Sequence, residues 1–147
     1  MDNDFEKAKR LVEETVRVLG LDPAAMCAEN TESHASWTLK RGSASVLVTV
    51  ARHAKSGETY LRVASPLVTL PSDTAKQLGM CRKLLELNAA GLSNAAFGLV
   101  GERVIAVSER PAPWLDPQEV QQMIRHLAAV ADTFDDRLAT EFGAAKA

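Results

Sequence analysis

The stretch from Leu115 to Gly143 reads LDPQEVQQMIRHLAAVADTFDDRLATEFG and has the start and stop signals of one long helix. Asp116 can accept hydrogen bonds from the free amides of the first turn, and Pro117 suits the first helical position. Glu119 stands where a capping box places a carboxylate. Gly143 can end the helix in the left-handed conformation. These signals predict a helix over the whole stretch.

The apolar residues of this helix recur on one side of it. At 3.6 residues per turn they fall within an arc of roughly 100°, the width of one buried face. A helix this long and this one-sided needs a sheet or other helices beneath it, and the preceding residues must supply them. The residues on the arc are Val120, Met123, Ile124, Leu127, Ala131, Phe134, Leu138 and Phe142.

Alternation of apolar and polar residues predicts strands upstream of the last helix. In one of them Val46, Val48 and Val50 share a face, while Leu47 and Thr49 share the other. Pro66 and Pro71 cannot donate to a ladder, so we expect them to bracket a connection after the third strand. The expected strands are Trp37–Lys40, Ser45–Ala51, Thr59–Ser65, Ala96–Val100 and Arg103–Ser108.

Two further helices are predicted. Residues 4–19 place their apolar side chains on one broad side and end before Gly20, and Ser72 or Asp73 can cap a helix over residues 74–88. The segment Leu21–Ser36 has no clear period, and we expect a long loop there with at most one helical turn at residues 23–27. The order α-β-β-β-α-β-β-α predicts an antiparallel sheet in a single α+β domain over residues 1–147.

The predicted helix over residues 74–88 is apolar on two sides. Leu78, Cys81 and Leu85 point about 140° away from Met80, Leu84 and Leu87 by wheel geometry, so one set is left over when the other faces the sheet. We expect a homodimer with Leu78, Met80, Leu84 and Leu87 at or beside the contact. The alternative is that the last helix or the loop Leu21–Ser36 covers the spare face.

Composition excludes several classes of protein. The formal net charge is -2, and the basic residues are scattered rather than clustered as nucleic-acid binding requires. No apolar run is long enough to span a bilayer, and the first residues, MDNDFEKAKR, lack the pattern of a signal peptide. Cys27 and Cys81 belong to no metal-binding spacing, so we expect free thiols in a reducing cytoplasm.

Several short stretches resemble the YbjN family of putative bacterial sensory transduction regulators, within the type III secretion chaperone-like fold. They are Ser65-Pro66-Leu67 with Leu70-Pro71, Leu84-Leu85-Glu86-Leu87-Asn88, the hairpin Phe97-Gly98-Leu99-Val100-Gly101-Glu102-Arg103-Val104, Leu115-Asp116-Pro117, Ala131-Asp132, Asp135-Asp136 and Phe142-Gly143. The resemblance covers residues 66–143 and is only topological before them. It implies a small cytoplasmic α+β protein that is usually dimeric, carries no catalytic machinery and binds an extended segment of a client protein.

The residues best placed to bind a protein or peptide are Leu47, Tyr60, Arg62 and Trp114. The first three lie on the strand face opposite the expected core. Trp114 is either an exposed anchor or a cover over the end of the second hairpin. Asn88 falls inside an apolar arc, and we expect its amide to satisfy the backbone of the turn at residues 89–91.

No stretch offers the nucleophile, base and orienter that catalysis needs, so we expect no enzyme and no cofactor. The alternative is an enzyme or ligand-binding regulator whose site is assembled from scattered residues such as His53, Tyr60 and Asp135. Asp132, Asp135 and Asp136 lie one turn apart, and we expect a solvated acidic face rather than a metal site there. His34, His53 and His126 are expected to be surface histidines.

Overall fold

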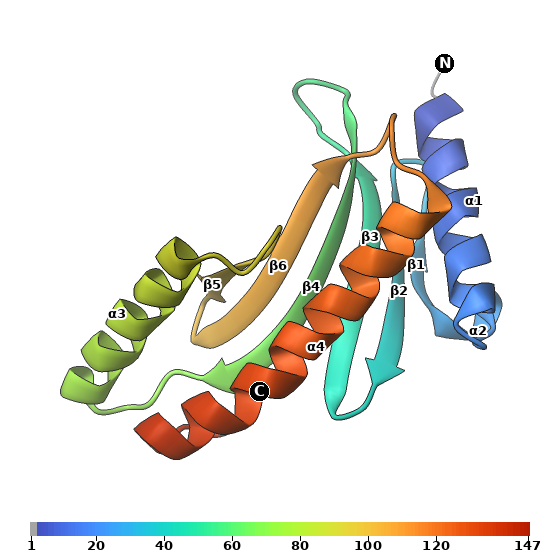
Figure 1. Cartoon of the computed structure of the whole chain (residues 1–147). Coiled ribbons are helices and arrows are strands. Elements are labelled where there is room, and N and C mark those ends of the chain that lie inside the picture. Colours follow the sequence, from blue (N-terminus) through green and yellow to red (C-terminus); the bar gives the residue numbers. More distant parts are fainter. Residues whose placement is uncertain (1–2) are drawn as a thin grey trace.

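A computed structural model of the chain describes residues 3–147 and has the expected α+β class (Figure 1). Its elements are α1 (Asn3–Val18), α2 (Pro23–Met26), β1 (Cys27–Asn30), β2 (His34–Arg41), β3 (Ala44–Arg52), β4 (Thr59–Thr69), α3 (Thr74–Ala90), β5 (Ala96–Val100), β6 (Arg103–Pro111) and α4 (Pro117–Phe142). The strands form one six-stranded antiparallel sheet in the order β1-β2-β3-β4-β6-β5. No helix in residues 3–147 is long and apolar enough to cross a membrane.

The sheet has one covered face and one open face. Helix α4 lies diagonally across the middle strands, and α1 lies beside it over β3 (Figure 1). Between these helices and the sheet lies the core, in which Val48 and Val63 face each other on neighbouring strands and are fully buried. Helix α3 lies at the other end of the sheet, next to β5 (Figure 1).

Helix α4 is built as its sequence predicts. The Asp116 side chain accepts from the Glu119 amide, and the Glu119 side chain accepts from the Asp116 amide, so the capping box is complete. Gly143 ends the helix at φ 62°, in the left-handed conformation. The expected apolar face is the buried face, although Phe134 and Phe142 at its edges are only partly buried.

Helix α2 is the single helical turn expected at residues 23–27, but the rest of the expected loop Leu21–Ser36 is wrong in part, because it contains β1 and the first residues of β2. All residues of β1 are exposed. The strand is held by backbone pairing with β2, with Cys27 opposite Trp37 and Asn30 opposite Ala35. A strand with no buried face has no apolar alternation, so its sequence carries no signal of the kind that identifies the other strands.

The connection expected at Pro66 is also wrong, because β4 continues through it to Thr69. Pairing with β3 ends at the pair Leu47–Ala64. The β3–β4 ladder therefore does not require the backbone N–H that Pro66 lacks. Towards β6 the register shifts between Pro66 and Val68, which makes this a bulge. Bulges and strand ends are the places where a sheet tolerates proline.

Residues 144–147 fill the position beside β4 that β3 leaves vacant. The Thr69 amide donates to the Ala145 carbonyl at 2.8 Å, and the Ala147 amide donates to the Leu67 carbonyl at 3.1 Å. Between these bonds Val68 and Lys146 form an antiparallel bridge. The end of the described chain thus returns to the sheet as a short extra strand.

Candidate interaction surfaces

The open face of the sheet carries a row of apolar side chains in direct register. Leu47 on β3 lies opposite Ala64 on β4, Ala64 lies opposite Val107 on β6, and Val107 lies opposite Ala96 on β5. Leu47 is 41% exposed, and the other members of the row are half-buried by their neighbours in the sheet. The row is a shallow apolar band that crosses the middle of the sheet.

A polar row lies beside this band. Arg62 on β4 lies opposite Glu109 on β6, and its Nη1 donates to Glu109 Oε2 at 3.1 Å. The alternation expected for β3 and β4 is therefore correct, since Leu47, Tyr60 and Arg62 share the open face. An apolar band next to fixed charged groups can give a bound segment both affinity and register.

Trp114 is exposed and does not cover the end of the second hairpin. Its side chain is 84% exposed in the connection between β6 and α4. At the same end of the sheet the rings of His53 and Tyr60 lie with their centroids 4.3 Å apart. Tyr60 pairs with Pro111, three residues before Trp114, so the structure brings Tyr60 and Trp114 to the same end of the sheet.

The two outer strands of the sheet, β1 and β5, differ in character. Strand β1 is short, contains Glu29 and has an irregular register with β2, features that discourage pairing with another chain. Strand β5 reads AFGLV without a charge, and its Leu99 and Val100 are exposed. The Asn88 side chain of α3 already bonds to the outward-facing backbone of Phe97, so this edge is blocked at that residue of β5.

Helix α3 has an apolar face that nothing in residues 3–147 covers. Leu78 is 72% exposed and Leu85 is 69% exposed. Met80 and Leu84, which we expected at a dimer contact, instead face the core of their own chain and are buried. Leu87 is partly buried against the same core. The two faces of α3 are therefore those the wheel predicts, and the exposed one carries Leu78 and Leu85.

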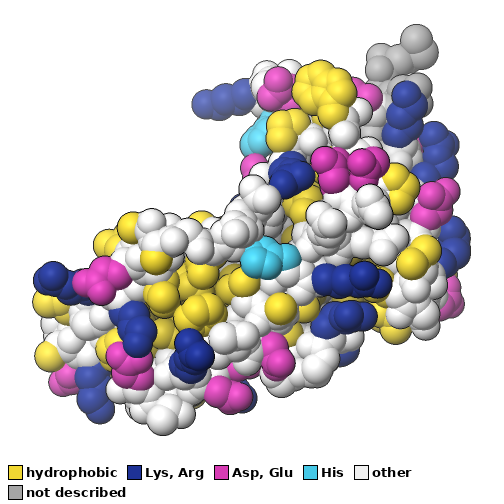
Figure 2. Space-filling model, in the orientation of Figure 1, with side chains coloured by type: hydrophobic (Ala, Val, Ile, Leu, Met, Phe, Trp, Pro, Cys, Tyr) yellow, Lys and Arg dark blue, Asp and Glu magenta, His cyan; other side chains and the backbone are white. Residues whose placement is uncertain are grey.

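The groove between α3 and α4 has apolar side chains at its inner end and a mixture of apolar and charged side chains at its outer end. Figure 2 shows hydrophobic side chains gathered in the hollow between these helices. At its inner end the rings of Phe97 and Phe134 meet edge to face with centroids 5.3 Å apart. The outer part is a hollow of about 530 Å³ whose lining includes Leu87 and Phe142.

Asn88 fixes α3 to β5 by a contact that the sequence did not predict. Its Nδ2 donates to the Phe97 carbonyl at 3.1 Å, and its Oδ1 accepts from the Phe97 amide at 2.8 Å. The amide thus has the structural role expected of it, but it satisfies the backbone of a strand nine residues away and not the turn at residues 89–91. The only sequence feature that indicated this structural role was the position of Asn88 within an apolar arc.

The alternative site of His53, Tyr60 and Asp135 is not assembled. His53 stacks on Tyr60 just beyond β3, whereas the Asp135 carboxylate lies 3.3 Å from Ser43 Oγ at the turn before β3. The length of β3 separates these two positions. Within residues 3–147 no group of three or more His, Cys, Asp or Glu side chains is arranged to hold a metal ion.

The acidic residues of α4 form the expected solvated face only in part, because Asp132 and Asp136 are exposed but Asp135 is buried. Asp135 is 6% exposed, because Ser43 and the returning end of the chain cover it. Asp132 accepts a hydrogen bond from Ser43 Oγ, and Asp136 forms an ion pair with Lys146. These contacts join α4 to the β2–β3 turn and to residues 144–147.

His126 is also not a simple surface histidine. It is half-buried, and its Nε2 lies 2.5 Å from the Leu92 carbonyl oxygen. This contact holds the loop after α3 against α4. In the same loop Ser93 and Asn94 have positive φ angles of 51° and 62°.

Cys27 is exposed, and both cysteines are free.

A sheet with helices on one face and an open apolar band on the other is typical of proteins that bind extended segments of other chains. Residues 6–147 match the family described as T3SS (YopN, CesT) and YbjN peptide-binding chaperone 1. The chain belongs to this family, as its resemblance to YbjN proteins and type III secretion chaperones implies. The function of the family is peptide binding. A comparison with curated protein sequences finds no match.

Solved structures show the same fold at low sequence identity. A chain of the ExsC–ExsE complex superposes with a TM-score of 0.66 at 21% identity, over 94% of this chain and 97% of that one. A chain of the HopA1–SchA chaperone–effector complex gives 0.61 at 14% identity, over 92% and 98%. A chain of the ExoU–SpcU complex from the type III secretion system of Pseudomonas aeruginosa gives 0.59 at 14%, over 85% and 95%.

Proposed function

We propose that this protein is a non-enzymatic, homodimeric chaperone or adaptor that holds an extended segment of a partner protein in the cytoplasm. The observation that carries the proposal is the open face of the sheet, where Leu47, Ala64 and Val107 form an apolar band in register beside the Arg62–Glu109 pair. The structural neighbours include a chaperone–effector complex, which supports a protein partner. The free thiols suit a reducing compartment.

The proposed binding residues are Leu47, Tyr60, Arg62 and Trp114. Leu47 and Trp114 are large apolar side chains left exposed in the monomer, and aromatic anchors contribute much of the affinity at protein interfaces. Tyr60 and Arg62 lie between them on the same face of β4. A segment that runs along β4 on the open face passes Leu47, Arg62 and Tyr60 and ends at the end of the sheet where Trp114 lies.

Peptides selected from a random library against the wild-type protein test this assignment. We expect Leu47→Glu and Trp114→Ala each to weaken binding of the selected peptide by about tenfold or more, a loss of about 1.4 kcal/mol. Val18→Glu is the matched control, because Val18 is 64% exposed on α1 and lies outside the proposed surface. Circular dichroism shows whether each variant remains folded. Unchanged binding in both folded variants would contradict the proposed surface.

A further inference from the structure

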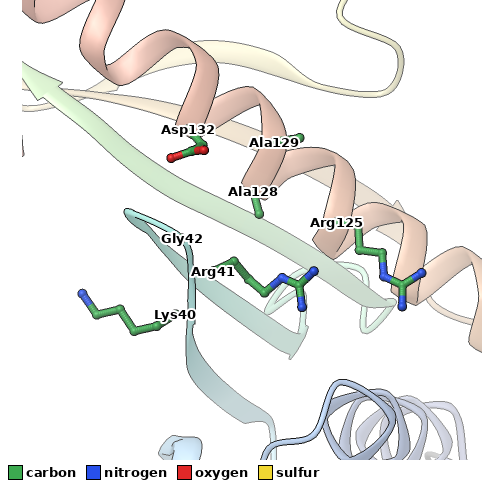
Figure 3. Close-up of a pocket in the computed structure, with 7 residues that line it drawn as sticks. All are labelled: Lys40, Arg41, Gly42, Arg125, Ala128, Ala129 and Asp132. Carbon is green, nitrogen blue, oxygen red and sulfur yellow. The ribbon is translucent and has the colours of Figure 1, made fainter.

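The turn between β2 and β3 forms one wall of a hollow whose other wall is α4. The hollow has a volume of about 390 Å³ and is lined by Lys40, Arg41, Gly42, Arg125, Ala128, Ala129 and Asp132. Ala128 and Ala129 have no side chain long enough to fill it. The result is a groove with a small-residue floor and cationic side chains at its rim (Figure 3).

The two arginines come from different elements and extend into the same space. Figure 3 shows the Arg41 and Arg125 side chains on the side of α4 that faces the β2–β3 turn, while Lys40 points away from them. This follows from strand alternation, because Leu39 and Arg41 lie on the helix side of β2 and Lys40 lies on the open side. Figure 2 shows Lys and Arg side chains grouped beside the middle of α4.

None of these three cations forms an ion pair within residues 3–147. Asp132, the carboxylate in the groove, accepts a hydrogen bond from Ser43 and lies beyond ion-pair distance of all three. The groove therefore has more positive charge than its own acidic residue balances. Two guanidinium groups near one another repel, and a bound anion relieves that repulsion.

Hydrogen bonds between the β2–β3 turn and α4 fix the two walls of the groove relative to each other. Ser43 Oγ lies within hydrogen-bonding distance of Asp132 and Asp135, which ties the turn to α4. Gly42 has φ +60°, and a Cβ built on it would lie 3.7 Å from the Asp132 carboxylate. The backbone that carries Arg41 is thus fixed relative to the helix that carries Arg125. Each guanidinium group can bind a carboxylate through two parallel hydrogen bonds.

We propose that this groove binds an acidic stretch of the client segment through its side-chain carboxylates. The inference rests on the proposed function, because it takes the ligand to be a peptide. Leu47 follows Arg41 by six residues on the same hairpin, so a segment over Leu47 reaches the groove by passing round the turn. Lys40, on the open side of that turn, continues the positive charge from the open face to the two arginines.

Two labelled peptides that differ only in charge test the inference. In one, apolar residues alternate with glutamates, and in the other the same apolar residues alternate with glutamines. We expect the wild-type protein to bind the glutamate peptide about tenfold tighter or more, measured by fluorescence anisotropy. Added salt should reduce the difference, because the groove is solvent-accessible.

Substitutions in the groove test whether the preference for the glutamate peptide arises there. The double variant Arg41→Gln, Arg125→Gln should bind the two peptides equally, whereas Arg103→Gln should retain the preference, since Arg103 is exposed on β6 and does not line the groove. A preference that survives in the folded double variant would overturn the assignment to this groove. Equal binding of both peptides by the wild-type protein would overturn the inference and leave the proposed function standing. Binding of neither peptide would count against both.

Discussion

At the scale of single residues, the Asn88 amide shows how much one polar group can organise. It forms both hydrogen bonds that a neighbouring strand residue would form with Phe97. These bonds fix α3, which also packs on the core through Met80 and Leu84, to the edge of the sheet. A half-buried amide satisfied in this way favours one arrangement of helix and strand.

Asn88→Asp is expected to lower the free energy of unfolding by roughly 1 to 3 kcal/mol. The substitution keeps the size of the side chain but replaces the Nδ2 donor with a carboxylate oxygen facing the Phe97 carbonyl. Chemical denaturation measures the loss. Asn94→Asp is the control, because Asn94 is exposed, and it should change stability by less than about 0.5 kcal/mol. Equal effects of the two substitutions would contradict a structural role for the Asn88 amide.

Leu127 tests the buried face of α4 in the same way. Its side chain is fully buried, so Leu127→Ala should cost about 2 to 5 kcal/mol through lost burial and the cavity that remains. Arg125, two residues earlier, is exposed, and Arg125→Ala should change stability by less than about 0.5 kcal/mol. If the two variants unfold at the same denaturant concentration, the face of α4 assigned to the core is incorrect.

At the scale of elements, residues 144–147 form a strand that depends on one charged side chain. Lys146 forms an ion pair with Asp136, and Asp135 lies 4.0 Å from its Nζ. The Asp136 hydrogen bond, supported by the charges of Asp135, Asp136 and Asp132, raises the pKa of Lys146 above its usual value of 10.5. These contacts favour the charged form of Lys146 in the folded state.

Lys146→Met should detach this strand from β4. In the wild-type protein the paired residues Val68 and Lys146 should give an Hα–Hα cross-peak in nuclear magnetic resonance spectra, because such protons lie close together in this kind of antiparallel pair. The cross-peak between the same positions should weaken or vanish in the variant. Its persistence at full intensity would show that backbone pairing alone holds the strand.

The attachment should also depend on pH in a direction set by the raised pKa of Lys146. A folded pKa above the unfolded one gives stabilisation that is complete below pH 10.5 and is lost as the pH rises through the folded pKa. The wild-type cross-peak should therefore remain constant from neutral pH to near 10 and weaken above that range. Weakening below pH 9 would contradict this assignment.

How far the sequence predicts each element depends on whether the element buries a face. Helix α4 and strands β3 and β4 alternate between core and solvent, so their faces, including Leu47, Tyr60 and Arg62 on the open side, follow from the sequence. Strand β1 is exposed throughout and gives no such signal. Contacts between distant elements, such as Asn88 with Phe97 or Ser43 with Asp135, depend on how the elements pack and are not encoded in any local spacing.

At the scale of the whole molecule, the exposed apolar residues lie mostly at one end. Leu78 and Leu85 are exposed on α3, and Leu99 and Val100 are exposed on the edge strand β5. The Asn88 contact joins this helix to this strand, so the two form one rigid unit. Exposed apolar side chains gathered on neighbouring elements of a single domain are typical of an interface. A two-fold contact would bury them against a second copy of the chain.

We therefore predict that the protein is a homodimer whose contact includes Leu78 and Leu85 but not Met80 or Leu84, which are buried in each chain. Leu78→Glu and Leu85→Glu should each convert the dimer to a folded monomer, because a carboxylate at the contact would lose its solvation without gaining a partner. Val18→Glu on α1 is the matched control and should leave the dimer intact, since Val18 is equally apolar and exposed but belongs to the other end of the sheet. Sedimentation equilibrium at micromolar concentration measures the assembly, and circular dichroism measures folding. A monomeric wild-type protein, or a dimer that persists in both folded glutamate variants, would contradict the predicted dimer contact.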